Sequence, residues 1–317
     1  MRSRVRYLLC CGMLLTSCGG SGSLTAVPGG GGSTPTPSPT STPTPTPSPA
    51  TTGEIKPTAT TQSTASVQFL TVDAGGSTTS SRSVVAAGSV FSIAYDTPTH
   101  TYSLHNDQYT KTFGPGQFTQ EASLPDYFPR VEYGSSTSSD QDFLIIFKAP
   151  NASPALPLSY AAYGAWQHNI AQASSTTRVR LDYFTYGTPT PAASVPQVGT
   201  TVYRWAGTGN YADNSRLFFA QSSGTMTVDW AAHTVTLSIL LSGSDFFGGN
   251  SGGLIGTTAT GTIAGNGMSG PLSFSIATYN GTFKGQFFGP NAEEFGLVFA
   301  AAGDPATFNG AIVGTRL

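Results

Sequence analysis

The chain has 317 residues, of which only 9% are charged, and its 14 basic and 16 acidic side chains give a net charge of −2. Soluble domains carry about 25% charged residues; here 38 glycines, 22 prolines and many serines and threonines take their place. This composition excludes coiled coils and long helical bundles, and the lack of any basic block argues against nucleic-acid binding. The cysteines are Cys10, Cys11 and Cys18, so the sequence beyond them offers no disulfide, thiolate metal site or cysteine nucleophile.

Residues 1–17 are predicted to be a lipoprotein signal peptide. Three arginines precede an apolar run over residues 7–15, which is the layout of a secretory signal and is too short to span a bilayer. The sequence LTSC that ends at Cys18 resembles the bacterial lipobox, in which the cysteine becomes the acylated first residue of the mature chain. An ordinary secretory signal with an incidental cysteine is the alternative. Cleavage before Cys18 would remove three arginines and leave 11 basic against 16 acidic residues, a net charge of −5.

Residues 18–65 are predicted to be a lipid anchor followed by a disordered tether. More than one acyl chain on Cys18 would anchor the protein stably, since a single chain binds a bilayer only marginally. No aspartate follows Cys18, which resembles outer-membrane sorting in enteric bacteria, so we expect a surface-exposed lipoprotein of a Gram-negative outer membrane. Residues 34–52 alternate proline with threonine or serine, which favours polyproline II and a reach of roughly 60 Å. We interpret this segment as a passive spacer.

Residues 66–317 are predicted to be all β, because period-2 alternation recurs throughout and no window shows a convincing helical period. Three prolines cluster in Ala149–Pro157 and suggest a boundary there. We therefore predict a β-rich handle subdomain over residues 66–155 and an eight-stranded antiparallel barrel over residues 156–317. The barrel would include strands at Leu158–His168 and Arg178–Tyr186, and Gly114–Tyr133 would be a loop of the handle.

The carboxy-terminal sequence GTFKGQFFGPNAEEFGLVF, over Gly281–Phe299, is followed by a last strand, FNGAIVGT. This pattern resembles the closing signature of the transferrin-binding protein B β-barrel family. Leu297 stands where the family often has a second glycine, and Phe295 replaces a usual leucine or valine. The residues that fit the signature are Gly285, Phe287, Phe288, Gly289, Pro290, Ala292, Glu293, Glu294, Gly296 and Phe299.

The resemblance implies a handle domain and an eight-stranded barrel presented outside the cell. Members of the wider family capture transferrin or haem-bearing proteins, or bind haem directly. The resemblance therefore implies a non-enzymatic, monomeric protein that binds a protein or small solute through handle and barrel loops, with haem or an iron carrier as candidates. A structural barrel of an envelope assembly, without a soluble ligand, is the alternative. We expect no resident cofactor or metal, since no phosphate-binding, dinucleotide or metal-spaced histidine motif occurs.

Six residues are candidate ligand contacts. Haem requires an axial ligand such as histidine, and His100 and His105 flank a short predicted strand in the handle, although a lone histidine in such a place is more often a solvated turn residue. The other four are aromatic residues of two turn-rich loops, Tyr127 with Phe128 and Phe246 with Phe247.

Two sequence patterns suggest catalysis, and each also has a structural interpretation. The sequence around Ser251, GNSGG, resembles the nucleophile loop of trypsin-like proteases, and His233 and Asp245 precede it in the right order. However, only 18 residues separate His233 from Ser251, whereas that family places the two on different barrels, and a triad is defined by geometry. The adjacent carboxylates Glu293 and Glu294 could perform acid–base chemistry, but we interpret them as part of a turn that closes the barrel. A serine hydrolase using Ser251 remains the lesser alternative to a binding protein.

Overall fold

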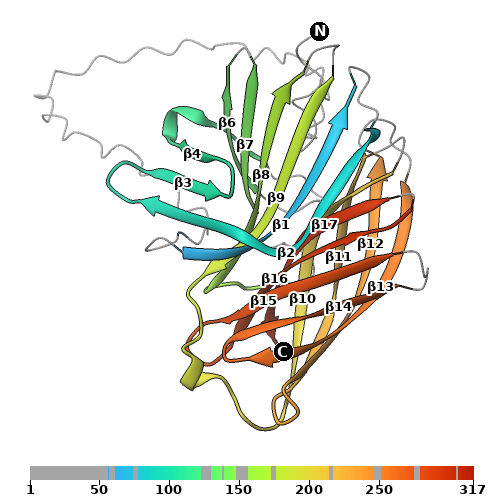
Figure 1. Cartoon of the computed structure of the whole chain (residues 1–317). Helices are drawn as coiled ribbons and strands as arrows, with labels where there is room; N and C mark the ends of the chain where they lie inside the picture. Colours follow the sequence, from blue (N-terminus) through green and yellow to red (C-terminus); the bar gives the residue numbers. More distant parts are fainter. Residues whose placement is uncertain are drawn as a thin grey trace, which may run out of the picture.

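The computed structural model describes residues 56, 61–73, 78–122, 130–137, 139–147, 156–172, 176–213, 217–245, 251–274, 279–304 and 306–317. These residues are all β apart from two single-turn 3-10 helices, η2 (Pro115–Gln117) and η4 (Ala192–Ser194). The strands form a nine-stranded sheet and a closed eight-stranded barrel (Figure 1), which confirms the predicted fold class. None of the helices in the described ranges is long and apolar enough to cross a membrane. Cys18 and the tether up to residue 55 lie outside the described residues.

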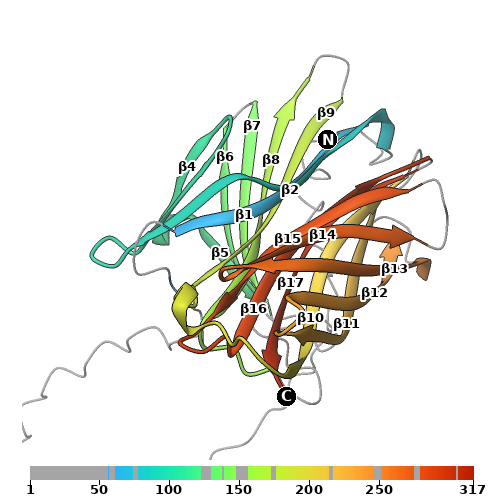
Figure 2. The same cartoon turned by 60° about the horizontal axis from the view of Figure 1, so that its bottom comes forward.

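The nine-stranded sheet is antiparallel, with the order β4-β3-β2-β1-β9-β8-β7-β6-β5. Its edge strands β4 and β5 follow each other in the chain, and the sheet curls so that β4 lies beside β6 (Figures 1 and 2). The ring of Tyr133 on β6 accordingly lies 5.6 Å from that of Tyr102 on β3. Apolar side chains fill the concave face that results. The strands are β1 (Thr61–Val72), β2 (Thr78–Asp96), β3 (Thr101–Asn106), β4 (Thr110–Phe113), β5 (Phe118–Ala122), β6 (Arg130–Ser136), β7 (Asp140–Phe147), β8 (Ala161–Ala171) and β9 (Thr177–Gly187).

Two strands that we expected in the barrel belong to the nine-stranded sheet instead. The segments Leu158–His168 and Arg178–Tyr186 fall in β8 and β9, which pair with each other and with β7 and β1. Both strands are buried on both faces, and such burial indicates a central strand without naming its neighbours. The barrel therefore begins at Thr200, and the two sheets divide within residues 188–199. The expected loop Gly114–Tyr133 contains β5 and the start of β6.

Each barrel strand pairs with the next in sequence, and β17 closes onto β10. Aromatic rings inside the barrel lie over glycines of neighbouring strands, where no side chain occupies the space. A Cβ at Gly310 would lie 2.5 Å from the ring of Phe299, and one at Gly314 would lie 2.3 Å from the ring of Phe295. The strands are β10 (Thr200–Ala212), β11 (Leu217–Asp229), β12 (Thr234–Asp245), β13 (Ser251–Ala264), β14 (Gly267–Phe274), β15 (Asn280–Phe288), β16 (Glu294–Ala302) and β17 (Thr307–Arg316).

The outer wall of the barrel packs against the convex face of the sheet. Apolar side chains of both units form one buried cluster, with Leu70, Val179 and Leu181 from the sheet and Val298 and Val313 from the barrel. Polar groups also bond across this interface. Gln68 Nε2 donates to Thr307 O and Oγ1 at 3.1 and 3.0 Å, and Asn309 Nδ2 donates to the backbone oxygens of Ser66 and Leu181, each at 3.2 Å. Sheet and barrel therefore form one continuous unit.

Strand register gives this unit two distinct ends. At one end β1 begins beside the end of β2, with Thr61 opposite Ile93 and the β2–β3 turn close by. We call this the near end. At the other, Val72 lies opposite Thr177, Asp140 lies opposite Ile170, and Ala212 lies opposite Thr307. We call this end the rim, and define it as residues 73, 139–140, 171–172, 176–178, 213 and 303–304.

Candidate functional site

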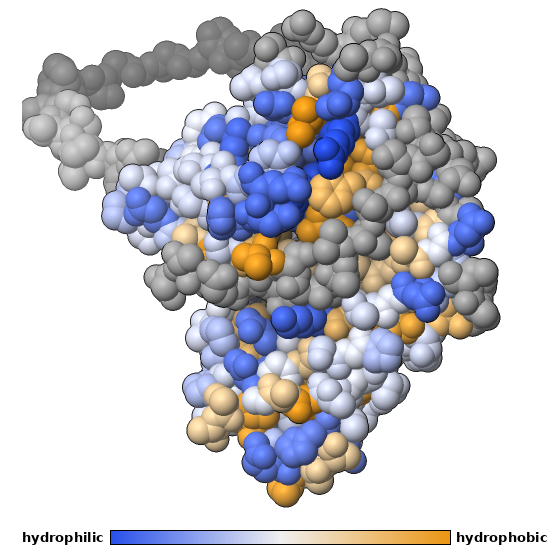
Figure 3. Space-filling model, in the orientation of Figure 1, coloured by the Kyte–Doolittle hydropathy of each residue, from blue (hydrophilic) through white to orange (hydrophobic). Residues whose placement is uncertain are grey.

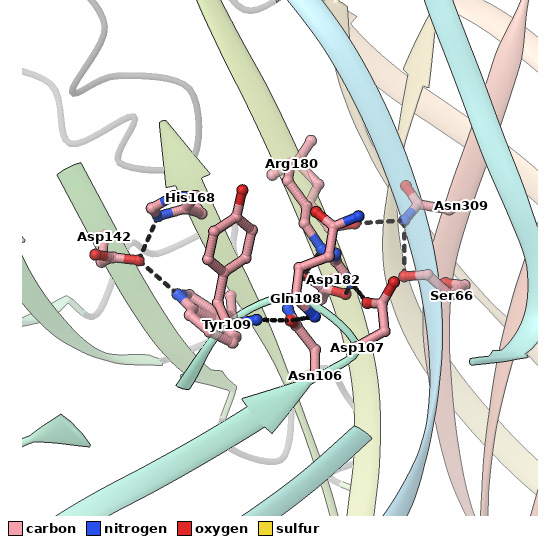
Figure 4. A network of polar contacts seen from close by, with 12 residues as sticks. Ser66, Asn106, Asp107, Gln108, Tyr109, Asp142, His168, Arg180, Asp182 and Asn309 are labelled. Atoms are coloured by element: carbon pink, nitrogen blue, oxygen red, sulfur yellow. Dashed lines mark hydrogen bonds and ion pairs between the residues drawn. The ribbon is translucent and has the colours of Figure 1, made fainter. Parts of the chain in front are cut away.

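A network of charged side chains lies beneath the turn between β3 and β4, on the concave face of the sheet (Figure 4). Asp142, His168 and Arg180 come from β7, β8 and β9 and are direct cross-strand neighbours on the concave face. Asp182 follows two residues after Arg180 and therefore shares that face. The hairpin contributes Asn106, Asp107, Tyr109 and Lys111. These eight residues are called the turn network below.

Asp142 is the centre of one half of the network. Its Oδ1 accepts a hydrogen bond from Trp166 Nε1 at 3.0 Å and lies 2.8 Å from His168 Nδ1. Its Oδ2 forms an ion pair with Lys111 Nζ at 2.8 Å. Burial alone would raise the pKa of Asp142, but the contacts with His168 and Lys111 hold that pKa below its ordinary value of 3.8. The ionised carboxylate thus connects three strands of the sheet.

Arg180 is the centre of the other half. Its guanidinium binds Asp182 through Nε and Nη2, each at 2.8–2.9 Å, and Nη2 also donates to Asp107 Oδ1 at 2.5 Å. The planar guanidinium suits such a two-point contact. It lies 5.3 Å from the ring centre of Phe69 and 5.9 Å from that of Tyr109. Burial raises the pKa of Asp182, and the charge of Arg180 opposes that rise.

Asn106 fixes the backbone of the turn. Its Oδ1 accepts hydrogen bonds from the backbone N–H groups of Gln108 at 3.0 Å and Tyr109 at 2.8 Å, which is an Asx turn. Its Nδ2 donates to Asp182 Oδ2 at 3.2 Å, and the ring of Tyr109 lies 4.4 Å from that of His168. The turn is therefore supported by side chains from two other strands, β8 and β9. Sequence reasoning missed this network, because its members are separated by up to 76 residues and no local pattern connects them.

Replacing Asp142 with asparagine should lower the stability of the protein by about 2 kcal/mol at neutral pH, since hydrogen bonds to charged groups contribute about that much. A carboxyl whose pKa is lowered on folding stabilises the fold above its unfolded pKa and loses that contribution as the pH falls through its folded pKa. Urea unfolding at several pH values should therefore show the difference between the native chain and Asp142→Asn disappearing below pH 3.8. An equal difference at pH 7 and pH 3 would contradict the role of the ionised carboxylate.

The structure separates the two candidate histidines. His100 lies in the β2–β3 turn with a φ of 54°, and its Nδ1 is 3.0 Å from Tyr95 Oη. His105 lies at the opposite end of β3, exposed, with Nδ1 2.9 Å from Thr110 Oγ1. Five residues along a strand place them roughly 16 Å apart, so they cannot share one ligand. Tyr127, Phe128, Phe246 and Phe247 lie outside the described residues. The part of the chain that the structure describes contains no group of three metal-binding side chains.

The arrangement suggested for a serine hydrolase does not form. His233 occupies the β11–β12 turn, where its carbonyl accepts a hydrogen bond from the N–H of Ile263. Ser251 pairs with Ser244 at the opposite end of the β12–β13 hairpin. Twelve residues of β13 separate Ser251 from Ile263, which corresponds to roughly 40 Å. His233 therefore cannot act as a base for Ser251.

The signature sequence closes the barrel. Phe287 points into the barrel core, whereas Phe288 packs in the interface with the sheet. Exposed Pro290 lies in the turn that follows, where Gly289 and Ala292 have φ values of 86° and 59°. Tyr203 Oη of β10 donates to Ala292 O at 2.6 Å, and burial raises the pKa of Tyr203 to about 12.

The two signature carboxylates have different environments. The carboxylate of half-buried Glu293 bonds locally, accepting from the backbone N–H and the side-chain amide of Asn291 at 2.8 and 3.0 Å. Buried Glu294 accepts three backbone N–H groups at the start of β8, from Ser159 at 2.6 Å, Tyr160 at 2.9 Å and Ala161 at 2.6 Å. Glu294 therefore joins the barrel to the sheet. The sequence gives no indication of this contact, because its partners lie 133 to 135 residues away.

The remaining signature residues allow close approach of strands. A Cβ at Gly285 would lie 2.4 Å from Gly296 O, and one at Gly296 would lie 2.9 Å from Thr185 of the sheet. Phe299 occupies the space above Gly310 inside the barrel. These contacts explain why glycine and a bulky ring alternate in this part of the sequence.

Comparison with known proteins gives one family match. Residues 164–316 match the model described as the C-lobe and N-lobe β-barrels of transferrin-binding protein B, a segment that also includes most of β8 and all of β9. No curated protein sequence matches the chain.

Several solved structures are distantly similar. They include the intact Ap-TbpB with both lobes (10% identity, TM-score 0.40, covering 83% of this chain and 78% of that one). Transferrin-binding protein B of Neisseria meningitidis serogroup B shows 14% identity and a TM-score of 0.39 over 73% of this chain and 52% of that one. A variant of the Haemophilus parasuis protein shows 15% identity and a TM-score of 0.38 over 73% and 54%. The chain thus spans about half the length of the last two.

Proposed function

Since residues 164–316 of this chain match the β-barrels of transferrin-binding protein B, we propose that the protein is an outer-membrane surface lipoprotein that captures an iron-carrier protein at its rim. The lipobox-like sequence at Cys18 and the predicted tether, which we expected over residues 18–65 although β1 already begins at Thr61, support the anchored location. The match to barrels of transferrin-binding protein B supports a protein partner of the iron-carrier kind. Ser251 and His233 are too far apart to form a catalytic pair, which also agrees with a binding role.

The location of binding is argued from the two distinct ends of the folded unit. The chain enters the sheet at the near end, where β1 begins at Thr61. The rim lies at the opposite end and combines connections of the sheet with connections of the barrel. A tether that joins the near end leaves the rim free to meet a large partner. Loops that a rigid scaffold holds at one end are a common place for binding residues.

A protein partner is favoured over free haem. His100 and His105 are too far apart to hold one haem between them. The barrel interior is occupied by its own aromatic side chains, including buried Trp205, Trp230 and Phe283. Recognition would then depend on the outer surface of the rim. Figure 3 shows that the most hydrophilic part of the visible face lies over the nine-stranded sheet, while much of the barrel wall is of intermediate hydropathy.

To test this proposal, the full chain is displayed on Gram-negative cells. Binding of fluorescently labelled, iron-loaded transferrin and lactoferrin to these cells is then measured. We expect saturable binding of one of them, which the unlabelled protein competes away. The Cys18→Ala chain should incorporate no labelled palmitate and should leave the cells without bound carrier. Absence of saturable binding by both carriers would contradict the proposed function and would favour a structural envelope barrel.

A further inference from the structure

We propose that the folded unit docks the end of the predicted tether, and that Lys56 is the docking residue because it binds Tyr95 of β2 at the near end. The chain would then be attached to the sheet five residues before β1 begins at Thr61. This docking involves no carrier protein and therefore goes beyond the proposed function. Three observations support it: the contacts of Lys56, the fixed position of Tyr95 and the length of chain that joins Lys56 to β1.

Lys56 makes two contacts with one side chain. Its Nζ donates a hydrogen bond to Tyr95 Oη at 2.9 Å, and the same atom lies over the Tyr95 ring, 4.4 Å from the ring centre. The face of the ring attracts the ammonium group, and the phenol oxygen gives it a directed acceptor. Together the two contacts should favour the docked position about tenfold over a free side chain.

The fold fixes the position of Tyr95 from two sides. Its half-buried ring packs against the apolar cluster of the concave face and lies 4.8 Å from the ring of Tyr102, the residue directly opposite on β3. On its other side, Tyr95 Oη lies 3.0 Å from Nδ1 of His100, which the β2–β3 turn holds at a φ of 54°. The hydroxyl can therefore accept from Lys56 while it donates to His100. Lys56 thus meets a group that is already in place.

The connection to β1 does not force Lys56 onto Tyr95. An extended chain of five residues reaches about 17 Å. Thr61 lies opposite Ile93, and Tyr95 follows two residues farther along β2, which corresponds to roughly 7 Å. The chain is therefore long enough to place Lys56 at many points, and its position on Tyr95 reflects the attraction between the two side chains.

The docked position determines where the chain leaves the folded unit. Tyr95 lies beside the β2–β3 turn at the near end, so the chain that leads to Cys18 is held there by Lys56 as well as by β1. A second attachment point restricts rotation of the folded unit about its tether. With a lipid anchor at Cys18, which belongs to the proposed function, the near end would face the membrane and the rim would face away from it.

Lysine acetylation of the full chain in detergent micelles tests the docking without any carrier. Mass spectrometry gives the rate at each lysine in the folded chain and in the same chain unfolded in urea, and the ratio removes differences in intrinsic reactivity. Because only an undocked amine reacts, Lys56 should be acetylated about tenfold more slowly in the folded chain. Exposed Lys284 on β15 should react equally fast in both. Lys111, whose amine is paired with Asp142, should also be protected, and its protection shows that the sheet is folded.

Three variants assign the protection to Tyr95. Tyr95→Leu removes the ring and the hydroxyl and should abolish the protection of Lys56. Tyr95→Phe keeps the ring and should retain about threefold protection. Tyr211→Leu is the matched control, because it replaces a half-buried tyrosine of the barrel, and it should leave the protection of Lys56 unchanged.

Two results would overturn the docking: equal rates at Lys56 in the folded and the unfolded native chain, or full protection of Lys56 in Tyr95→Leu while Lys111 stays protected. If Tyr95→Leu loses the protection of Lys111 as well, it is unfolded and Tyr95→Phe decides, since undiminished protection of Lys56 in that variant overturns the docking. These results do not depend on a carrier. A chain that docks Lys56 but binds neither carrier would contradict the proposed function alone.

Discussion

Replacing Gly285 with alanine should destabilise the protein by about 3 kcal/mol and lower its thermal midpoint by roughly 10 °C. The new Cβ would lie 2.4 Å from the carbonyl oxygen of Gly296 and 2.5 Å from the Cβ of Leu297. Both contacts belong to β16, which pairs with β15 through nine residues, so the backbone cannot move aside without breaking the ladder. Differential scanning calorimetry of the native chain and the variant measures this effect.

Gly256 provides the matched control for that substitution. It also lies in a barrel strand, but a Cβ there would meet only the Cδ1 of Leu240, at an ordinary contact distance of 3.9 Å. Gly256→Ala should therefore leave the midpoint unchanged or raise it slightly, because alanine restricts the unfolded chain. Equal losses from the two substitutions would show that glycine is needed for a reason other than close packing.

Replacing Glu294 with alanine should cost about 3 kcal/mol, because three backbone N–H groups at the start of β8 lose a charged acceptor. Hydrogen exchange should accelerate at the amides of Ser159, Tyr160 and Ala161, the three groups that Glu294 holds. Thermal unfolding and exchange measured by mass spectrometry or NMR test both parts.

Glu293→Ala is the control, since it removes the neighbouring carboxylate of the same turn. The Glu293 carboxylate is half-buried and hydrogen-bonds to Asn291 of the same turn. Its loss should therefore change stability by well under 1 kcal/mol and should leave exchange at residues 159–161 unaltered. Similar effects from the two substitutions would contradict the assignment of Glu294 as the link between barrel and sheet.

The sequence allowed the strands and the signature to be predicted, because both are local. Alternation along one strand shows which faces are buried, and it correctly indicated an all-β chain. The turn after Phe288 could also be anticipated, because glycine followed by proline favours a turn.

Partner choice between strands could not be predicted in the same way. β8 and β9 are buried on both faces, so their composition is the same whether they join a barrel or a sheet. β5 was missed because five residues among turn-forming residues give too short an alternation. The hydrogen bonds of Glu294, Arg180 and Asp142 form only because the fold brings distant segments together. No local sequence pattern therefore predicts them.

Hydrogen exchange of the full chain, with and without the iron carrier that binds it, measures directly which end of the molecule meets its partner. Binding at the rim predicts slower exchange at rim residues such as 139–140, 171–172 and 303–304, and unchanged exchange in the β2–β3 turn at residues 97–100. Protection confined to the β2–β3 turn, or protection absent from these rim residues while the carrier is bound, would contradict capture at the rim.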